Sequence, residues 1–219
     1  MAESATSASP YVPAGADLDA LREAARGCHG CHLYQNATQT VFGRGPAHAK
    51  VVMVGEQPGD VEDRRGEPFV GPAGAVLRRA VGDAQLPPDE LYVTNAVKHF
   101  KYAQRGPRRI HQKPDRAEII ACRPWLAAEF AHLRPQAVIA LGATAAQALL
   151  GNQFRVSRSR GQIMPWPESA DRPDDFPAPA QPAFVLATLH PSAVLRADDR
   201  ESAYRGLVAD LVVAAQALR

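Results

Sequence analysis

The feature of this sequence that most limits its fold is a set of four short apolar runs, with helical segments between them. The runs cover residues 50–55, 91–97, 136–142 and 183–192. Short apolar runs that alternate with helices are typical of parallel strands joined by crossover connections. The sequence therefore predicts an α/β fold, a three-layer sandwich in which helices flank both faces of a mainly parallel, four-stranded central sheet.

Segments with helical spacing of apolar residues lie between and around the predicted strands. We expect helices at residues 16–27, 71–84, 115–133, 143–151 and 201–219. The third of these contains Pro124, where we expect a kink or a break because proline lacks the N–H that a helix interior uses. Residues 165–182 are rich in proline and polar residues, which predicts a long exposed loop.

The chain has 219 residues, a length that fits one domain better than two. Residues 1–15 have the composition of a disordered tail, so we expect a single domain at residues 16–219, without internal repeats. No apolar run approaches the ~18 residues of a membrane span, and the N-terminus lacks the pattern of a secretory signal. We therefore expect a soluble, cytoplasmic monomer that makes no contact with membranes.

Polar side chains follow three of the predicted strands. Glu56, Gln57 and Asp60 lie in a Gly/Pro turn after the first strand, Asn95 lies near the end of the second, and His190 lies where the last runs into a turn. Because ligands bind at the carboxyl ends of such strands, we expect these side chains to converge on one crevice. An amide offers a donor and an acceptor side by side, which suits the edge of a flat heterocycle.

Phe69 is an aromatic residue that could contribute to this predicted crevice. It lies in residues 67–74, a loop that leads into a predicted helix. A phenylalanine there could stack on a planar ring, although a single phenylalanine is more often part of the core. The sequence alone leaves both interpretations open.

Basic residues are concentrated between residues 98 and 113, although the net charge of the whole chain is only +2. This window contains three of the four lysines of the chain. Its basic residues are Lys98, Lys101, Arg105, Arg108, Arg109 and Lys113. By composition alone the window predicts a loop that contacts nucleic-acid phosphates, with His111 as one of its contact residues.

The chain has three cysteines, an odd number that argues against a disulfide framework and favours metal binding or catalysis. Cys28 and Cys31 form a C-x2-C pair, and Cys122 is far along the chain. Spacing alone favours a Cys3His zinc site with His99 as the fourth ligand. An iron–sulfur cluster is the alternative, since histidine can replace a cysteine ligand. The histidines of the CHGCH segment are poorer candidates for the fourth ligand.

Five motifs, together with the three cysteines, resemble those of the uracil-DNA glycosylase superfamily. They are GEQPG (55–59), FVGPAG (69–74), TNAVKHFK (94–101), RRIH (108–111) and HPS (190–192). Within the superfamily the sequence is most similar to the UdgX group, iron–sulfur relatives of family 4 that become covalently attached to uracil-containing DNA. The resemblance covers residues 20–217 and implies the fold of that superfamily. Related iron–sulfur enzymes carry a fourth cysteine where this sequence has His99, a departure that is characteristic of the UdgX group.

The resemblance implies a cluster, a uracil pocket and a DNA-binding surface. The ligands of a 4Fe-4S cluster would be Cys28, Cys31, His99 and Cys122. The uracil pocket would contain Gly55, Gln57, Asp60, Phe69 and Asn95, with Phe69 stacked on the ring and Asn95 bonded to its edge. The DNA phosphates would contact Lys98, Arg108, Arg109 and Ser192. Single-stranded DNA would be favoured because a base is more easily flipped from it.

The resemblance also assigns three catalytic roles. His190 would donate a hydrogen bond to the uracil oxygen that becomes negatively charged as the glycosidic bond breaks. His111 would then attack C1′ of the sugar before water does, and Glu56 would orient or deprotonate His111 and stabilise the cation. The product would be a stable covalent protein–DNA complex, so each molecule would act once.

Two alternative functions remain compatible with the sequence. The first is a turnover uracil-DNA glycosylase in which His111 only binds phosphate and water completes the hydrolysis. The second belongs to a different class, a non-catalytic nucleic-acid-binding module with a Cys3His zinc site. Capture of DNA separates the first alternative from the UdgX-type interpretation, and the identity of the metal separates the second.

Overall fold

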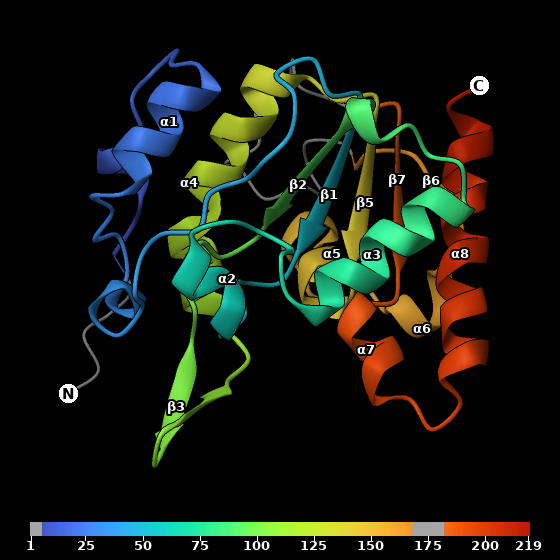
Figure 1. The fold of residues 1–219 in the computed structure, drawn as a ribbon. Helices are drawn as coiled ribbons and strands as arrows, with labels where there is room; N and C mark the ends of the chain where they lie inside the picture. The colour runs from blue at the N-terminus through green and yellow to red at the C-terminus, as the bar shows by residue number, and fades with distance from the viewer. Residues whose placement is uncertain (1–5, 168–181) are drawn as a thin grey trace.

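The computed structural model describes residues 6–167 and 182–219, and a five-stranded sheet forms the centre of this part of the chain (Figure 1). Its strands are β1 (Val51–Gly55), β2 (Leu91–Asn95), β5 (Ala137–Leu141), β6 (Ile163–Met164) and β7 (Phe184–Thr188). They lie in the order β2-β1-β5-β7-β6, and all pairings are parallel except that of β6 with β7. The predicted α/β class and mainly parallel sheet are confirmed, with one short antiparallel strand beyond the four expected.

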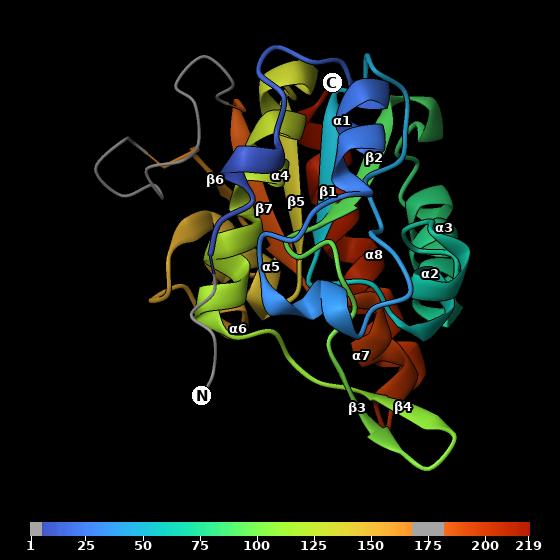
Figure 2. The same ribbon diagram turned by 90° about the vertical axis from the view of Figure 1, so that its left-hand side faces the viewer.

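Helices cover both faces of the sheet. Figure 1 shows the sheet with α4 on one side and α8 on the other. The helices of the described residues are α1 (Leu18–Ala25), α2 (Asp60–Arg65), α3 (Pro72–Asp83), α4 (Arg116–Leu133), α5 (Ala143–Leu150), α6 (Val156–Ser159), α7 (Pro191–Arg196) and α8 (Arg200–Ala217). Short 3-10 turns lie at Ser9–Tyr11, His32–Gln35 and Pro88–Glu90. Figure 2 shows α1, α4 and α5 together on one side of the molecule.

Strand β1 shows how the sheet separates two hydrophobic cores. Val52 and Val54 belong to the core formed with α1, α4 and α5, whereas Val51 and Met53 belong to the core formed with α3 and α8. Successive side chains of a strand point to opposite faces, so a strand that is covered on both sides must be apolar throughout. All five residues of β1 are buried.

Helix α4 runs through Pro124 without interruption, so the chain does not break at this residue, where we expected a kink or a break. Asp115 caps the helix by accepting from the Glu118 N–H, and the Glu118 carboxylate accepts from the Asp115 N–H. This reciprocal capping box satisfies two N–H groups at the start of the helix. Burial of one face of α4, including Trp125 and Leu126, offsets the hydrogen bond that proline cannot make.

Residues 6–15 lie against the domain, so the prediction of a disordered tail is wrong for this part of the segment. Ala8 is buried in the core beside α4, and its N–H donates to the Ala121 carbonyl at 2.8 Å. This contact depends on one small side chain and one backbone hydrogen bond, and composition does not reveal either of them.

The remaining expectations concern the predicted loop at residues 165–182 and the absence of membrane spans. Of the loop predicted at residues 165–182, residues 168–181 lie outside the described residues. Within residues 6–167 and 182–219, every helix is too short or too polar to cross a lipid bilayer.

Lys98 lies at the centre of a buried polar network and not on the surface, so its predicted contact with DNA phosphate is wrong. Its ammonium group lies 2.6 Å from Glu129 Oε2, and it donates to the Thr94 hydroxyl and to the Asn95 carbonyl. Glu129 also accepts a hydrogen bond from Tyr92 Oη at 3.0 Å. The network therefore joins the centre of α4 to the end of β2, where the candidate site begins.

We expect Glu129→Gln to lower the free energy of unfolding by about 3–5 kcal/mol, because it leaves the Lys98 charge buried without its counter-ion. Urea denaturation measures this loss. The matched control is Glu201→Gln on the surface of α8, where the carboxylate lies 3.6 Å from Arg205 and both side chains are exposed. There we expect a change of about 0.5 kcal/mol or less. Equal losses in the two variants would contradict a structural role for the buried pair.

Candidate active site

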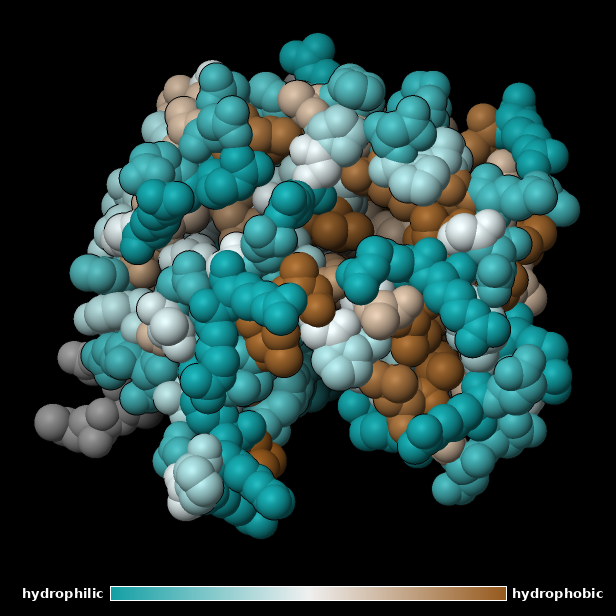
Figure 3. Space-filling model, viewed as in Figure 1, coloured by the Kyte–Doolittle hydropathy of each residue, from teal (hydrophilic) through white to brown (hydrophobic). Residues whose placement is uncertain are grey.

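Residues 102–111 form a β-hairpin that projects from the domain (Figures 1 and 2). The sequence predicted only a basic loop here. Strands β3 (Tyr102–Arg105) and β4 (Arg108–His111) pair in antiparallel fashion, with Tyr102 opposite His111. The projecting part is mainly hydrophilic at its surface (Figure 3). The hairpin gives each residue a defined side, because neighbouring residues of a strand face opposite ways.

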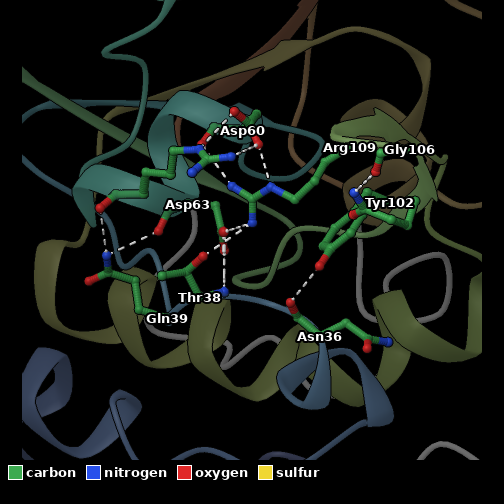
Figure 4. Close-up of polar contacts among 10 residues, drawn as sticks. Asn36, Thr38, Gln39, Asp60, Asp63, Tyr102, Gly106 and Arg109 are labelled. Atoms are coloured by element: carbon green, nitrogen blue, oxygen red, sulfur yellow. Dashed lines mark hydrogen bonds and ion pairs between the residues drawn. The ribbon is translucent and has the colours of Figure 1, made fainter.

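Arg109 fastens the hairpin to helix α2 (Figure 4). Its Nε donates to Asp60, and its Nη1 lies 2.6 Å from Asp63 Oδ2. Only 9% of the Arg109 side chain is exposed, so its guanidinium is committed to these carboxylates and not to DNA phosphate as predicted. Asp60 is likewise an anchor and not a wall of the pocket, since it also pairs with Arg64 at 3.0 Å. The predictions for Arg109 and Asp60 were wrong because they assigned each charge to a ligand, whereas the two side chains pair with each other.

Aromatic rings and one amide complete the attachment of the hairpin. The Arg109 guanidinium lies over the rings of Phe100 and Tyr102, 5.4 and 5.1 Å from their centroids. Gln57 Nε2 donates to the carbonyls of Lys101 and Gln112, and Gln57 Oε1 accepts from the Lys101 N–H. Gln57 therefore joins the two ends of the hairpin segment to the turn that follows β1.

A cavity of about 640 Å³ opens at the carboxyl ends of the parallel strands. Among the residues that line it are Glu56, Gln57, Phe69, Asn95, His111, His190 and Ser192, all of which the sequence analysis selected. Asp60 is not among the described residues that line it. The strands bring these side chains together from β1, β2 and β7, as expected for a parallel sheet.

The Glu56 carboxylate and the His111 imidazole face each other in this cavity. Glu56 Oε1 lies 3.3 Å from His111 Nε2, and Glu56 Oε2 accepts a hydrogen bond from the Thr144 hydroxyl. Burial opposes ionisation of Glu56, but the hydrogen bonds from His111 and Thr144 outweigh it and lower the pKa of the carboxyl group. Glu56 is therefore a carboxylate at neutral pH.

His190 is held as a neutral imidazole with a defined proton position. Burial lowers the pKa of His190 to about 4, despite the opposing influence of Glu56. The Ser192 N–H donates to Nδ1 of His190 at 3.1 Å. Because Nδ1 accepts this hydrogen bond, the single proton of the neutral ring is on Nε2. The ring can thus donate one hydrogen bond from Nε2.

Asn95 and Phe69 line the inner wall of the cavity; the predicted pocket residue Gly55 lies next to both side chains but is not among the described residues that line it. Asn95 is 2% exposed, and its side-chain amide makes no hydrogen bond to the described residues. Phe69 has a positive φ of 54°, a strained conformation for a residue with a side chain. A Cβ at Gly55 would lie 2.4 Å from Asn95 Oδ1 and 2.7 Å from Phe69 Cζ, so only glycine lets both side chains occupy this wall.

Thr144, Glu62 and Arg196 also line the cavity but were not expected from the sequence, and Lys113 was expected only as part of the basic window. Thr144 follows β5, a strand for which no polar end had been noted. The available signal was weak: Thr144 lies two residues after the LG of that strand end, and every other parallel strand contributes a polar residue near this edge.

The three cysteines are buried, and Cys28 and Cys122 accept hydrogen bonds from N–H groups near α4. Trp125 Nε1 donates to Cys28 Sγ at 3.2 Å, and the Lys98 N–H donates to Cys122 Sγ at the same distance. Cys31 is 6% exposed. N–H donors directed at sulfur favour the thiolate that a metal ligand needs, but at Cys122 burial acts more strongly in the opposite direction.

Burial favours the neutral forms of the candidate ligands, a thiol for each of two cysteines and an uncharged imidazole for the histidine, so a metal would have to displace the thiol protons. Burial raises the pKa of Cys122 to about 12 and also raises that of Cys31, whereas burial lowers the pKa of His99 to about 4. His99 Nε2 lies 3.0 Å from the Thr40 hydroxyl. Within the described ranges, no group of three or more His, Cys, Asp or Glu side chains is arranged to hold a metal ion.

The family model described as the Uracil DNA glycosylase superfamily matches residues 42–212. The matched region contains the whole sheet, the hairpin and every residue named above as lining the cavity. The protein belongs to the uracil-DNA glycosylase superfamily.

Several characterised proteins with the name type-4 uracil-DNA glycosylase are similar to this chain over most of its length. The protein of Thermotoga maritima is 31% identical over 180 residues, which are 82% of this chain and 83% of the relative. The protein of Pyrobaculum aerophilum is 35% identical over 147 residues, 67% of this chain and 71% of the relative. That of Saccharolobus solfataricus is 30% identical over 184 residues, 82% of this chain and 77% of the relative.

We expect Arg109→Lys to loosen the hairpin, because an ammonium group cannot satisfy Asp60 and Asp63 with the fork geometry of a guanidinium. Hydrogen exchange of residues 102–111 measures the effect, and amides of the hairpin should exchange at least several-fold faster. The control is Arg108→Lys on the exposed side of the same strand, which should leave the exchange rates unchanged. Identical rates in the two variants would contradict an anchoring role for Arg109.

Proposed function

We propose that this protein excises uracil from DNA and then captures the resulting sugar centre with His111, as UdgX-type enzymes do. The observation that carries the proposal is the pairing of His111 with Glu56 at 3.3 Å inside the cavity that also contains His190 and Asn95. Membership of the uracil-DNA glycosylase superfamily and the names of the relatives support the first half of the proposal. The second half rests on the position and the surroundings of the imidazole.

Recognition of uracil is assigned to the inner wall of the cavity. The Asn95 amide has no partner among the described residues, so it can donate to a carbonyl oxygen and accept from the adjacent ring N–H of uracil. Cytosine presents the reversed order of hydrogen-bond donor and acceptor along this edge, so it would leave the Asn95 amide unsatisfied. Phe69 stacks on the ring. A flipped base reaches such a pocket most easily from single-stranded DNA, which we therefore take as the preferred substrate.

Cleavage of the glycosidic bond leaves the bonding electron pair on uracil and positive character on C1′. His190 donates from Nε2 to the uracil oxygen that takes up this charge. Because its pKa is about 4, the ring is a neutral donor at physiological pH and does not have to lose a proton before substrate binds. The Glu56 carboxylate stabilises the positive character on the sugar.

Capture forms a bond between a ring nitrogen of His111 and C1′. The lone pair of one nitrogen makes the bond, and the proton on the other nitrogen passes to Glu56, which leaves a neutral N-alkyl imidazole. A fixed nucleophile beside the cation has an effective concentration that can reach about 10⁵ M, well above that of water. The hairpin supplies this fixation through Arg109 and Gln57. The product has no good leaving group, so the complex persists.

Contacts with the DNA backbone are assigned to cationic and polar groups around the rim of the cavity. Arg108 is exposed on the hairpin, and Lys113, Ser192 and Arg196 line the opening. Arg196 Nη1 lies 3.0 Å from Ser192 Oγ, so both can approach one phosphate. These groups replace Lys98 and Arg109, which are committed to buried carboxylates.

We further propose that Cys28, Cys31, His99 and Cys122 hold a 4Fe-4S cluster. In such a cluster each protein ligand binds a different iron, so the ligands need not converge on one point as they do around a single ion. Burial, N–H donors directed at two of the sulfurs, and a neutral His99 suit this ligand set. When bound, the cluster supplies structural support, because its ligands come from the segment after α1, the loop after β2, and α4.

We expect His111→Ser to abolish the covalent complex while uracil release continues, because water can then reach C1′. The protein is incubated with a single-stranded oligonucleotide that contains one uracil, and a denaturing gel separates adduct from free DNA. Alkaline cleavage reports abasic sites. The control is His48→Ser, an exposed histidine before β1 at the opposite end of the sheet, which should form the adduct at the wild-type rate.

Each contrary result of this experiment has a defined meaning. Abasic product without any adduct from the wild-type protein would support a turnover glycosylase and contradict capture. An adduct formed by His111→Ser would assign capture to another residue. If the wild-type protein forms neither adduct nor abasic sites, uracil excision itself is contradicted.

We expect the purified protein to be brown, with broad visible absorbance and bound iron, and Cys122→Ala to lose both iron and colour because a buried ligand is removed. Iron analysis and absorbance spectra measure this. His29→Ala is the control, since His29 is an exposed neighbour of Cys28 and is not a proposed ligand. A colourless protein loaded with zinc would contradict the cluster.

A further inference from the structure

The two oxygens of the Glu56 carboxylate have different partners. Oε1 lies 3.3 Å from His111 Nε2, whereas Oε2 accepts a hydrogen bond from the hydroxyl of Thr144. Thr144 lines the same cavity but is only 3% exposed. A carboxylate held through one oxygen cannot turn freely, so the direction in which the other oxygen points is fixed.

The sheet topology brings Thr144 to Glu56. Strand β5 lies beside β1, and Thr144 is the second residue of α5, the helix that follows β5, just as Glu56 directly follows β1. Between β5 and α5, Gly142 has a φ of +90°, and a Cβ there would lie 2.9 Å from the Cβ of His190. The glycine therefore lets the start of α5 approach both the Glu56 turn and the His190 segment.

We infer that Thr144 is a positioning residue for the proposed capture reaction. Its hydroxyl holds Glu56 so that Oε1 faces His111 and Oε2 stays occupied. The inference rests on the proposed function and extends it to a residue that none of the sequence motifs contains. A hydroxyl can donate to a carboxylate and cannot take its place as a proton acceptor. Thr144 therefore acts through Glu56 and does not itself touch the reacting atoms.

The hydrogen bond from Thr144 also favours the charged form of Glu56. The other titratable or charged groups that line the cavity are His111, Lys113, His190, Arg196 and Glu62. With Thr144 in place, hydrogen bonds from His111 and Thr144 hold the pKa of Glu56 below its usual value against the effect of burial. Without the Thr144 hydroxyl, one of the hydrogen bonds that counteract burial is lost. The pKa of Glu56 therefore rises, and a smaller fraction of Glu56 is ionised at mildly acidic pH.

The test compares Thr144→Val with Thr144→Ser in the full-length protein. Valine keeps the shape of threonine and removes the hydroxyl, whereas serine keeps the hydroxyl. Single-turnover rates of uracil release and of adduct formation are measured between pH 4.5 and 8 with the single-uracil oligonucleotide. We expect Thr144→Val to form the adduct about tenfold more slowly near neutral pH, as for a lost hydrogen bond to a charged group. We expect the acid limb of its profile to move to higher pH.

Thr144→Ser should show the wild-type rate of adduct formation and the wild-type pH profile. If both variants behave like the wild-type protein, or if both lose activity equally without a shift of the acid limb, the inference is overturned. If Thr144→Val fails to fold, as judged by its urea denaturation, Thr144→Ala takes its place. A wild-type protein that neither releases uracil nor forms an adduct contradicts the proposed function instead, so the two failures are distinguishable.

Discussion

The geometry of the candidate site depends on one ion-pair arrangement, the grip of Asp60 and Asp63 on Arg109. The hairpin projects from the domain and has few apolar contacts of its own, and an isolated two-stranded ribbon is marginally stable in water. A guanidinium held by two carboxylates of α2, beneath the rings of Phe100 and Tyr102, supplies the attachment that a hydrophobic core would otherwise give. Because His111 lies two residues beyond Arg109 on the same strand, the position of its imidazole follows from this attachment.

Buried polar groups connect this hairpin to the rest of the domain. Lys98 and Glu129 join β2 to α4, and Glu118 at the start of α4 lies 2.8 Å from Lys101 at the base of the hairpin. Helix α4 also carries Cys122. One candidate cluster ligand, the end of β2 and the base of the hairpin are thus all attached to α4. A cluster that contributes no chemistry to uracil excision can still affect the reaction through the helix that supports the hairpin.

The sequence predicted the sheet well, because strands that are covered on both faces leave uninterrupted apolar runs and their carboxyl ends must meet at one edge. Glu56, Asn95 and His190 were found for this reason, and Phe69 and His111 through the resemblance. Charge was harder to interpret. Lys98, Arg109 and Asp60 have the same sequence signature whether they face DNA or a buried partner, and only the packing of α2, α4 and β2 decides between these environments. Thr144 was missed because a hydroxyl after a strand has no distinctive pattern.

The alternation of side chains along β4 limits which insertions and deletions the hairpin can accept. Arg109 and His111 lie on one side of the strand, where they contact Asp63 and Glu56 of the domain, whereas Arg108 and Ile110 lie on the other side. Gain or loss of a single residue between the anchor and the imidazole would turn one of the two outward, since the period of a strand is two. Homologous chains that retain both features should therefore vary in the length of the hairpin tip, at Gly106 and Pro107, and keep the spacing within β4 constant.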